Sequence, residues 1–183
     1  MFRRRALIRS ARRGAFVLDI PPLLQRANDL MAGGEYHAAA AAFEELARLA
    51  RARNGPRAPF LFLQAGRARL LAGNNEAGLA HFKQGLALLA AHGQWPLLNR
   101  AGNRVVDELK ERNMTAEAKR IEDYLKTTLP PDLPAEPAVA GRRPALPTHC
   151  PGCGGPVRPD EVEWLDEVTA ECSYCGSPLR GEN

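Results

Sequence analysis

The sequence predicts a mainly α protein in which three helical hairpins stack as an α-solenoid, followed by a small β unit at the C-terminus. Three observations support this. Apolar residues recur at a helical period between residues 23 and 129, turn-forming pairs interrupt that stretch at nearly equal intervals, and four cysteines form two matched pairs near the C-terminus. We therefore expect four parts: a basic arm over 1–22, a helical repeat domain over 23–129, a Pro-rich linker over 130–147 and a cysteine-containing unit over 148–183.

The arm over residues 1–22 is strongly basic, with six arginines against Asp19 and a net charge of +5. Such an arm either binds nucleic acid or anionic lipid, or remains a solvated tail, and the sequence leaves these alternatives open. Its longest apolar stretch, residues 15–18, is shorter than the apolar region of a secretory signal. No apolar run in the sequence is long enough for a transmembrane segment either, so we expect a cytoplasmic protein whose thiols are reduced.

Helical periodicity begins after the arm. In the first hairpin, apolar residues three or four apart share one helix face: Tyr36, Ala39, Phe43, Leu46 and Ala50. Turn-forming pairs mark the inner turn of each hairpin and recur roughly every 40 residues: Gly33-Gly34, Gly73-Asn74 and Asn113-Met114. These signals predict six helices, over residues 23–32 and 36–53, 58–72 and 75–92, and 96–112 and 115–128.

These residues resemble the tetratricopeptide repeat family over about 105 residues. The positions that match the family's turn glycine, small residues and aromatics are Gly34, Tyr36, Ala39 and Phe43 in the first hairpin, and Gly66, Gly73 and Phe82 in the second. The third hairpin keeps only Ala118 and the periodicity. The repeats are longer than is usual in this family. Gly78 and Gly85 also occupy positions where alanine is usual, and each glycine destabilises its helix by roughly 1 kcal/mol relative to alanine. A plain helical bundle remains the alternative, because periodicity alone does not separate it from a solenoid.

The resemblance implies a concave surface that binds an extended peptide. The polar residues that would face it are Asn28 in the first hairpin, Arg67 in the second, and Arg100, Asn103 and Arg104 in the third. Amide and guanidinium groups bind backbone groups and carboxylates, so the expected partner is a protein or peptide with acidic character. The alternative is that these are ordinary solvated helix residues.

The linker over residues 130–147 contains six prolines in 18 residues. Proline at this density favours an extended spacer rather than a packed element. We therefore expect the C-terminal unit to reorient freely with respect to the helices.

The cysteines are Cys150 and Cys153, then Cys172 and Cys175, with two residues inside each pair and eighteen between the pairs. This spacing is typical of a tetrahedral zinc site with four cysteine ligands, in which each Cys-x-x-Cys turn supplies two of them. Gly154 and Gly176 follow the pairs, where such turns need a residue that tolerates positive φ. We expect one structural Zn²⁺. The alternatives are two disulfides, a redox-active pair, or an iron ion bound by the same four cysteines.

Between the pairs, apolar and acidic residues alternate at strand period. Val162 and Trp164 precede a turn at Asp166-Glu167, and Val168 and Ala170 follow it. Two cysteine turns around a hairpin resemble the zinc ribbon family over about 30 residues. We expect Trp164 to pack beside the metal, with an exposed anchor for a partner as its alternative role. Residues 148–183 carry a net charge of −5, the wrong sign for a phosphate-binding surface.

The sequence contains no catalytic motif at a diagnostic spacing, since its histidines lack a paired carboxylate or nucleophile. We therefore predict a non-enzymatic protein–protein interaction adaptor, with a helical platform for one partner and the zinc unit for a second. Two alternatives remain: a nucleic-acid-associated factor that uses the basic arm and basic repeats, and a regulatory subunit of an enzyme complex.

Overall fold

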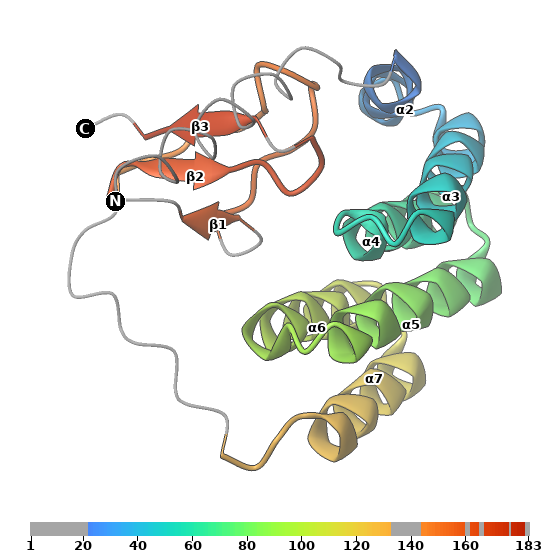
Figure 1. Ribbon diagram of the computed structural model, residues 1–183. Helices are drawn as coiled ribbons and strands as arrows, with labels where there is room; N and C mark the ends of the chain where they lie inside the picture. The colour runs from blue at the N-terminus through green and yellow to red at the C-terminus, as the bar shows by residue number, and fades with distance from the viewer. Residues whose placement is uncertain (1–21, 133–143, 160–161, 165–166, 176, 182–183) are drawn as a thin grey trace, which may run out of the picture.

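The computed structural model of the chain describes residues 22–132, 144–159, 162–164, 167–175 and 177–181. The described helices are α2 (Pro22–Ala32), α3 (Tyr36–Ala52), α4 (Ala58–Leu71), α5 (Asn75–Ala91), α6 (Trp95–Glu111) and α7 (Thr115–Thr128) (Figure 1). Each end lies within one residue of its predicted position, so the mainly helical fold and these six helices are confirmed. The predictions for the basic arm and for most of the linker lie outside the described residues.

Residues with a left-handed backbone conformation close the turns between successive helices. Gly34 and Gly73 have φ values of 77° and 79° at two of the predicted glycine turns. Gly93, Asn54 and Asn113 have φ values of 66°, 50° and 60° at the other three. Glycine adopts this conformation without steric cost, and asparagine tolerates it better than most residues. The turn-forming residues of the sequence therefore end the helices where they were expected to.

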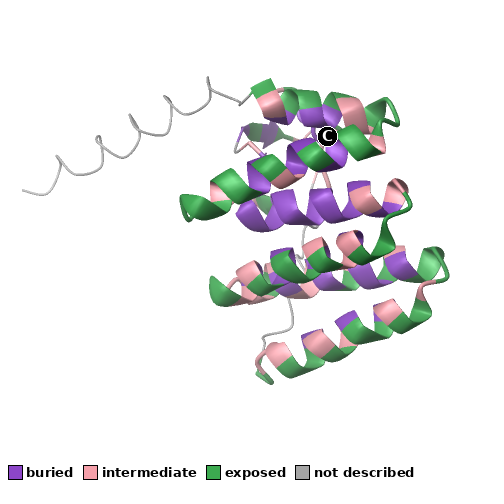
Figure 2. Ribbon diagram, turned by 90° about the vertical axis from the view of Figure 1, so that its right-hand side faces the viewer, coloured by how far each residue is buried: buried purple, intermediate pink, exposed green. Residues whose placement is uncertain are grey.

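Helix α4 lies at the centre of the packing. Each helix contacts the next one along the chain, and α5 also contacts α7. Almost every residue of α4 is buried, because α3 and α5 cover two of its sides and the C-terminal unit covers another (Figure 2). Its sequence accordingly lacks the polar face of an ordinary surface helix. None of the described helices has both the length and the apolar composition of a membrane span.

Glycines bring α4 and α5 unusually close together. A Cβ atom at Gly66 would lie 2.7 Å from the Phe82 ring and 2.9 Å from the carbonyl oxygen of Gly78. A Cβ atom at Gly78 would in turn lie 2.9 Å from the side chain of Leu70. Both distances are too short for a real side chain, so alanine does not fit at Gly78 without a shift. The close approach explains why the sequence accepts the helix-propensity cost of glycine there.

The sheet consists of β1 (Glu163–Trp164), β2 (Thr169–Glu171) and β3 (Pro178–Arg180), in the order β1-β2-β3 with antiparallel pairing. The predicted hairpin is confirmed, with Trp164 opposite Ala170. Strand β3 was not predicted; it places Leu179 opposite Ala170, where both side chains are buried. Val168, expected to point inward, is instead 38% exposed. Strand β2 begins at Thr169, so Val168 lies outside the strand whose alternating side chains were expected to include it.

The described residues from Thr148 to Gly181, here called the four-cysteine unit, lie beside the helices rather than apart from them. The sheet lies on the same side of the helices as α2 and α4 (Figure 1). Hydrogen bonds from α2 and α4 reach its loops. The cysteines are therefore held at the surface of the helical part.

Candidate metal centre

Two short loops position the cysteines. In the first loop, the backbone N–H of Cys150 donates to the carbonyl oxygen of Gly155 at 2.8 Å, and Gly154 N–H donates to the carbonyl of Cys150 at 2.9 Å. Gly154 has a φ of 71°, which confirms the predicted need for a residue that tolerates positive φ. In the second loop, Cys172 N–H donates to the carbonyl of Ser177 at 3.0 Å. The companion prediction for Gly176 lies outside the described residues.

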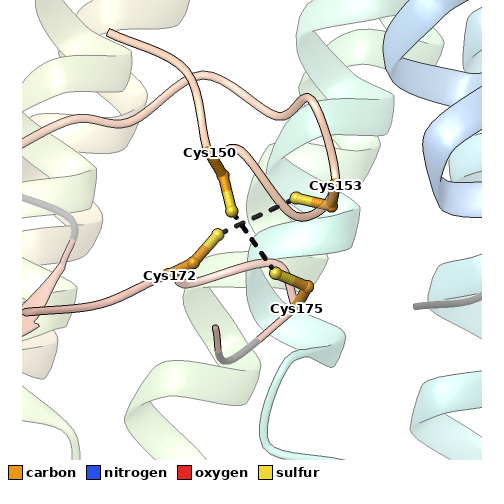
Figure 3. A group of neighbouring side chains, drawn as sticks. All are labelled: Cys150, Cys153, Cys172 and Cys175. Carbon is orange, nitrogen blue, oxygen red and sulfur yellow. Dashed lines mark hydrogen bonds between the residues drawn. The ribbon is translucent and has the colours of Figure 1, made fainter. Parts of the chain in front are cut away.

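The loops bring the four sulfurs together, with all four Sγ atoms within 4.8 Å of one another (Figure 3). The Sγ atoms of Cys150 and Cys175 are 3.6 Å apart, and those of Cys153 and Cys172 are 3.9 Å apart. Sulfurs bound about 2.3 Å from a tetrahedral zinc ion lie about 3.8 Å from one another, whereas a disulfide requires about 2.0 Å. The four cysteines are free thiols whose arrangement fits one tetrahedral ion.

Crowding makes the four thiols ionise differently. Hydrogen bonds with Cys153 and Cys172 lower the pKa of the Cys150 thiol to about 6. The largest effect on the other three thiols is a hydrogen bond with Cys150. It lowers the pKa of Cys175 and raises the pKa values of Cys153 and Cys172. Hydrogen bonds among the thiols therefore keep part of the cluster protonated, and a divalent cation that binds all four thiolates would displace these protons.

Ser177 makes two contacts with the sulfur of Cys175. The backbone N–H of Ser177 donates to Cys175 Sγ at 3.5 Å, and Cys175 Sγ donates to Ser177 Oγ at 3.1 Å. Contacts of this kind orient side chains that bind metals. His149 does not join the cluster: its side chain is exposed, and its Nδ1 lies 3.2 Å from Thr148 Oγ1.

Helix α2 binds the backbone of the first cysteine loop. Asn28 is only 6% exposed, and its Nδ2 donates to the carbonyl oxygen of Cys153 at 2.9 Å. One turn earlier, Gln25 Nε2 donates to the carbonyl of Gly152 at 3.2 Å. Gly155 packs tightly here, since a Cβ atom at this position would lie 3.2 Å from Asn28 Nδ2. One of the four clustered cysteines and its neighbour are thus attached to a helix that is distant in sequence.

Helix α4 binds the second cysteine loop. Gln64 Nε2 donates to the hydroxyl group of Tyr174, and both side chains are buried. Arg57, just before α4, pairs with Glu171 on β2 at 3.4 Å. These contacts, together with those from α2, contradict the expectation that the linker leaves the C-terminal unit free to reorient. The sequence did not predict that Gln25, Arg57 and Gln64 contact the C-terminal unit, because nothing in their local pattern shows that the chain folds back onto them.

Tyr174 lies beside the first cysteine loop, a position that Trp164 was expected to take. Its ring would lie 2.9 Å from a Cβ atom at Gly155, and only 3% of the residue is exposed. Trp164 is half-buried and instead lines a cleft of about 420 Å³ between the start of α6 and β1, together with Leu97, Arg100 and Val162. The ring of Trp164 is therefore placed where a binding partner could reach it.

The five polar residues predicted to bind a peptide are not equivalent. Asn28 binds the Cys153 carbonyl. Arg67, 9% exposed, donates to Glu108 at 3.0 Å and to Gln64 at 3.2 Å. Arg100 lines the cleft beside β1, Arg104 is half-buried, and Asn103 is exposed and donates to Asn99 at 3.1 Å. The structure thus brings Asn28 and Arg67 towards the four-cysteine unit, and Gln64 links Arg67 to Tyr174.

Comparison of the chain with protein-family models, with curated proteins and with solved structures found no match.

Proposed function

We propose that Cys150, Cys153, Cys172 and Cys175 hold one structural Zn²⁺, and that the chain is a non-enzymatic protein–protein interaction adaptor. The observation that carries the metal proposal is the set of four sulfurs at tetrahedral spacing. Four cysteine ligands leave no coordination position for a substrate, so the ion serves folding rather than catalysis. This proposal includes the zinc-ribbon character of the four-cysteine unit.

The helical part is proposed to be a tetratricopeptide-like α-solenoid. Consecutive packing of the helices supports this, as do the small residues at the crossing of α4 and α5. In such an architecture each hairpin contacts mainly its neighbours, and the first helices of successive hairpins share one surface. Here the four-cysteine unit contacts α2 and α4, which are two of those first helices.

The surface best suited to a partner is the cleft between α6 and β1. Leu97, Val162 and Trp164 give it an apolar lining, and Arg100 and Glu163 add one charge of each sign. Buried apolar surface with a few polar groups is typical of binding clefts, and tryptophan is common among residues that dominate binding. Because one wall belongs to the helices and the other to the four-cysteine unit, an adaptor role requires both parts.

Site-specific photo-crosslinking tests the adaptor proposal. A photoreactive phenylalanine derivative in place of Leu97 should give a discrete crosslinked protein in the source cell. The same derivative in place of Leu49, which is 41% exposed on α3, is the matched control. Identical crosslinking patterns at both positions would contradict a binding role for the cleft. A nucleic-acid adduct, or one enzyme as the sole partner, would instead support the alternative functions.

A further inference from the structure

The helical part binds the four-cysteine unit through four polar side chains, which lie beside apolar residues that both parts contribute to one core. These four side chains are here called the docking surface: Gln25, Asn28, Arg57 and Gln64. They bind two backbone carbonyls, one carboxylate and one phenol of the four-cysteine unit. Amides and a guanidinium that bind backbone and carboxylate groups are what a peptide-binding surface needs. The docking surface therefore already binds a ligand, which is the chain's own C-terminal part.

Two hollows lie at the junction between the four-cysteine unit and the helices. The cleft of about 420 Å³ opens on one side, and a smaller hollow of about 90 Å³ lies between Arg57, Phe60 and Leu97 on the helices and Glu171 and Cys172 on the four-cysteine unit. Protein interiors contain few voids larger than a water molecule. Polar contacts and unfilled space at a junction are typical of interfaces between units that move relative to one another.

A bound metal would fix the positions of the groups that dock. The carbonyls of Gly152 and Cys153 belong to the first cysteine turn, and Tyr174 lies between the two cysteines of the second. The apolar core of the four-cysteine unit is small, and its buried aliphatic side chains among the described residues are Val162, Ala170 and Leu179. So small a core does not offset the entropy of an ordered chain without a metal. Loss of the ion would therefore unfold the cysteine loops, and the two carbonyls and the Tyr174 hydroxyl would no longer be held in position to bind the helices.

We propose that the four-cysteine unit is a metal-dependent lid on the docking surface. With the ion bound, the lid covers this surface; without it, the lid leaves and the four polar side chains become available to a protein partner that presents backbone carbonyls and a carboxylate. Partner binding at the docking surface then requires loss of the metal, whereas partner binding at the cleft requires the metal to be bound. This inference rests on the proposed zinc site.

Nuclear magnetic resonance on the intact, isotope-labelled chain tests the lid directly. The side-chain amide groups of Asn28 and Gln64 report docking, and the exposed amide of Asn103 is the control. When a chelator removes the ion, hydrogen exchange at the first two amides should accelerate by roughly tenfold or more, while exchange at Asn103 stays constant. Backbone signals of α3 and α5 should persist, and added Zn²⁺ should restore the docked state.

Metal analysis of the same samples distinguishes the ways in which the proposal can fail. If the chain never binds Zn²⁺, both the proposed metal site and the lid are wrong. If the ion leaves but the Asn28 and Gln64 amides stay protected, the metal site stands and the lid is overturned. If the signals of α3 and α5 disappear together with the ion, the four-cysteine unit is an inseparable part of one folded unit, and the lid is again overturned. X-ray scattering supplies an independent readout, since an opened chain has a larger radius of gyration.

Discussion

Replacement of Asn28 by alanine should weaken zinc binding although Asn28 is not a metal ligand. The substitution removes the 2.9 Å hydrogen bond to the Cys153 carbonyl at a site where only 6% of Asn28 is exposed. A buried carbonyl left without its donor costs about 1–3 kcal/mol. Because docking and metal binding are linked equilibria, the same free energy appears in the affinity of the ion. The apparent zinc affinity should fall by about 5- to 150-fold.

A competition titration of the full chain against a chromogenic zinc chelator measures this change. Asn103→Ala is the matched control, because it removes an exposed amide whose hydrogen bond to Asn99 joins two residues of the same helix. The control should change the affinity by less than about twofold, as surface substitutions usually alter stability by no more than about 0.5 kcal/mol. Equal affinities of Asn28→Ala and the unaltered chain would refute the linkage between helix α2 and the metal centre.

Three further substitutions test the packing and the charges. Gly66→Ala places a Cβ atom 2.7 Å from the Phe82 ring, so the free energy of unfolding should fall by about 1–3 kcal/mol. Urea titrations followed by circular dichroism measure this change, and a higher free energy of unfolding, as helix propensity alone would give, would contradict the close contact between the helices. Glu44→Gln should cost roughly 1 kcal/mol at neutral pH, because the Arg69 hydrogen bond lowers the pKa of Glu44 below 4.5 and stabilises the charged form. That stability is present above pH 4.5 and is lost as the pH falls through the lowered pKa, so the difference between the two chains should shrink as the pH is lowered below 4.5. A difference that does not change with pH would mean that packing causes it. Gly155→Ala should speed zinc release and leave the helical signal unchanged, whereas an unchanged release rate would mean that the contact with α2 is not tight.

The sequence was sufficient to predict the helices, and its two cysteine pairs do come together, because both features follow from local patterns. Turn residues such as Gly34 and Gly73 end helices through their own backbone preferences. The two Cys-x-x-Cys pairs need only their loops and one ion to converge. Spacing along the chain therefore carries the information needed to predict both features, although contacts from α2 and α4 also hold the cysteine loops.

The docking of the four-cysteine unit was not predictable, because no local pattern encodes it. A Pro-rich linker indicates an extended spacer but does not say where its far end binds. Gln64 and Tyr174 are 110 residues apart, and neither stands out among its neighbours in sequence. Strand β3 was missed for a related reason: its three residues become a strand only through pairing with β2.

Native mass spectrometry of the full chain, purified without chelator, tests the metal centre most directly. The account predicts one zinc ion per chain, with protons displaced from the thiols, and loss of most bound zinc in the Cys172→Ser variant. Retention of the same helical signal by that variant would show that the substitution acts at the metal rather than on the fold of the helices. A reduced, unaltered chain that carries no metal, or a Cys172→Ser variant that binds zinc as tightly as the unaltered chain, would contradict the account.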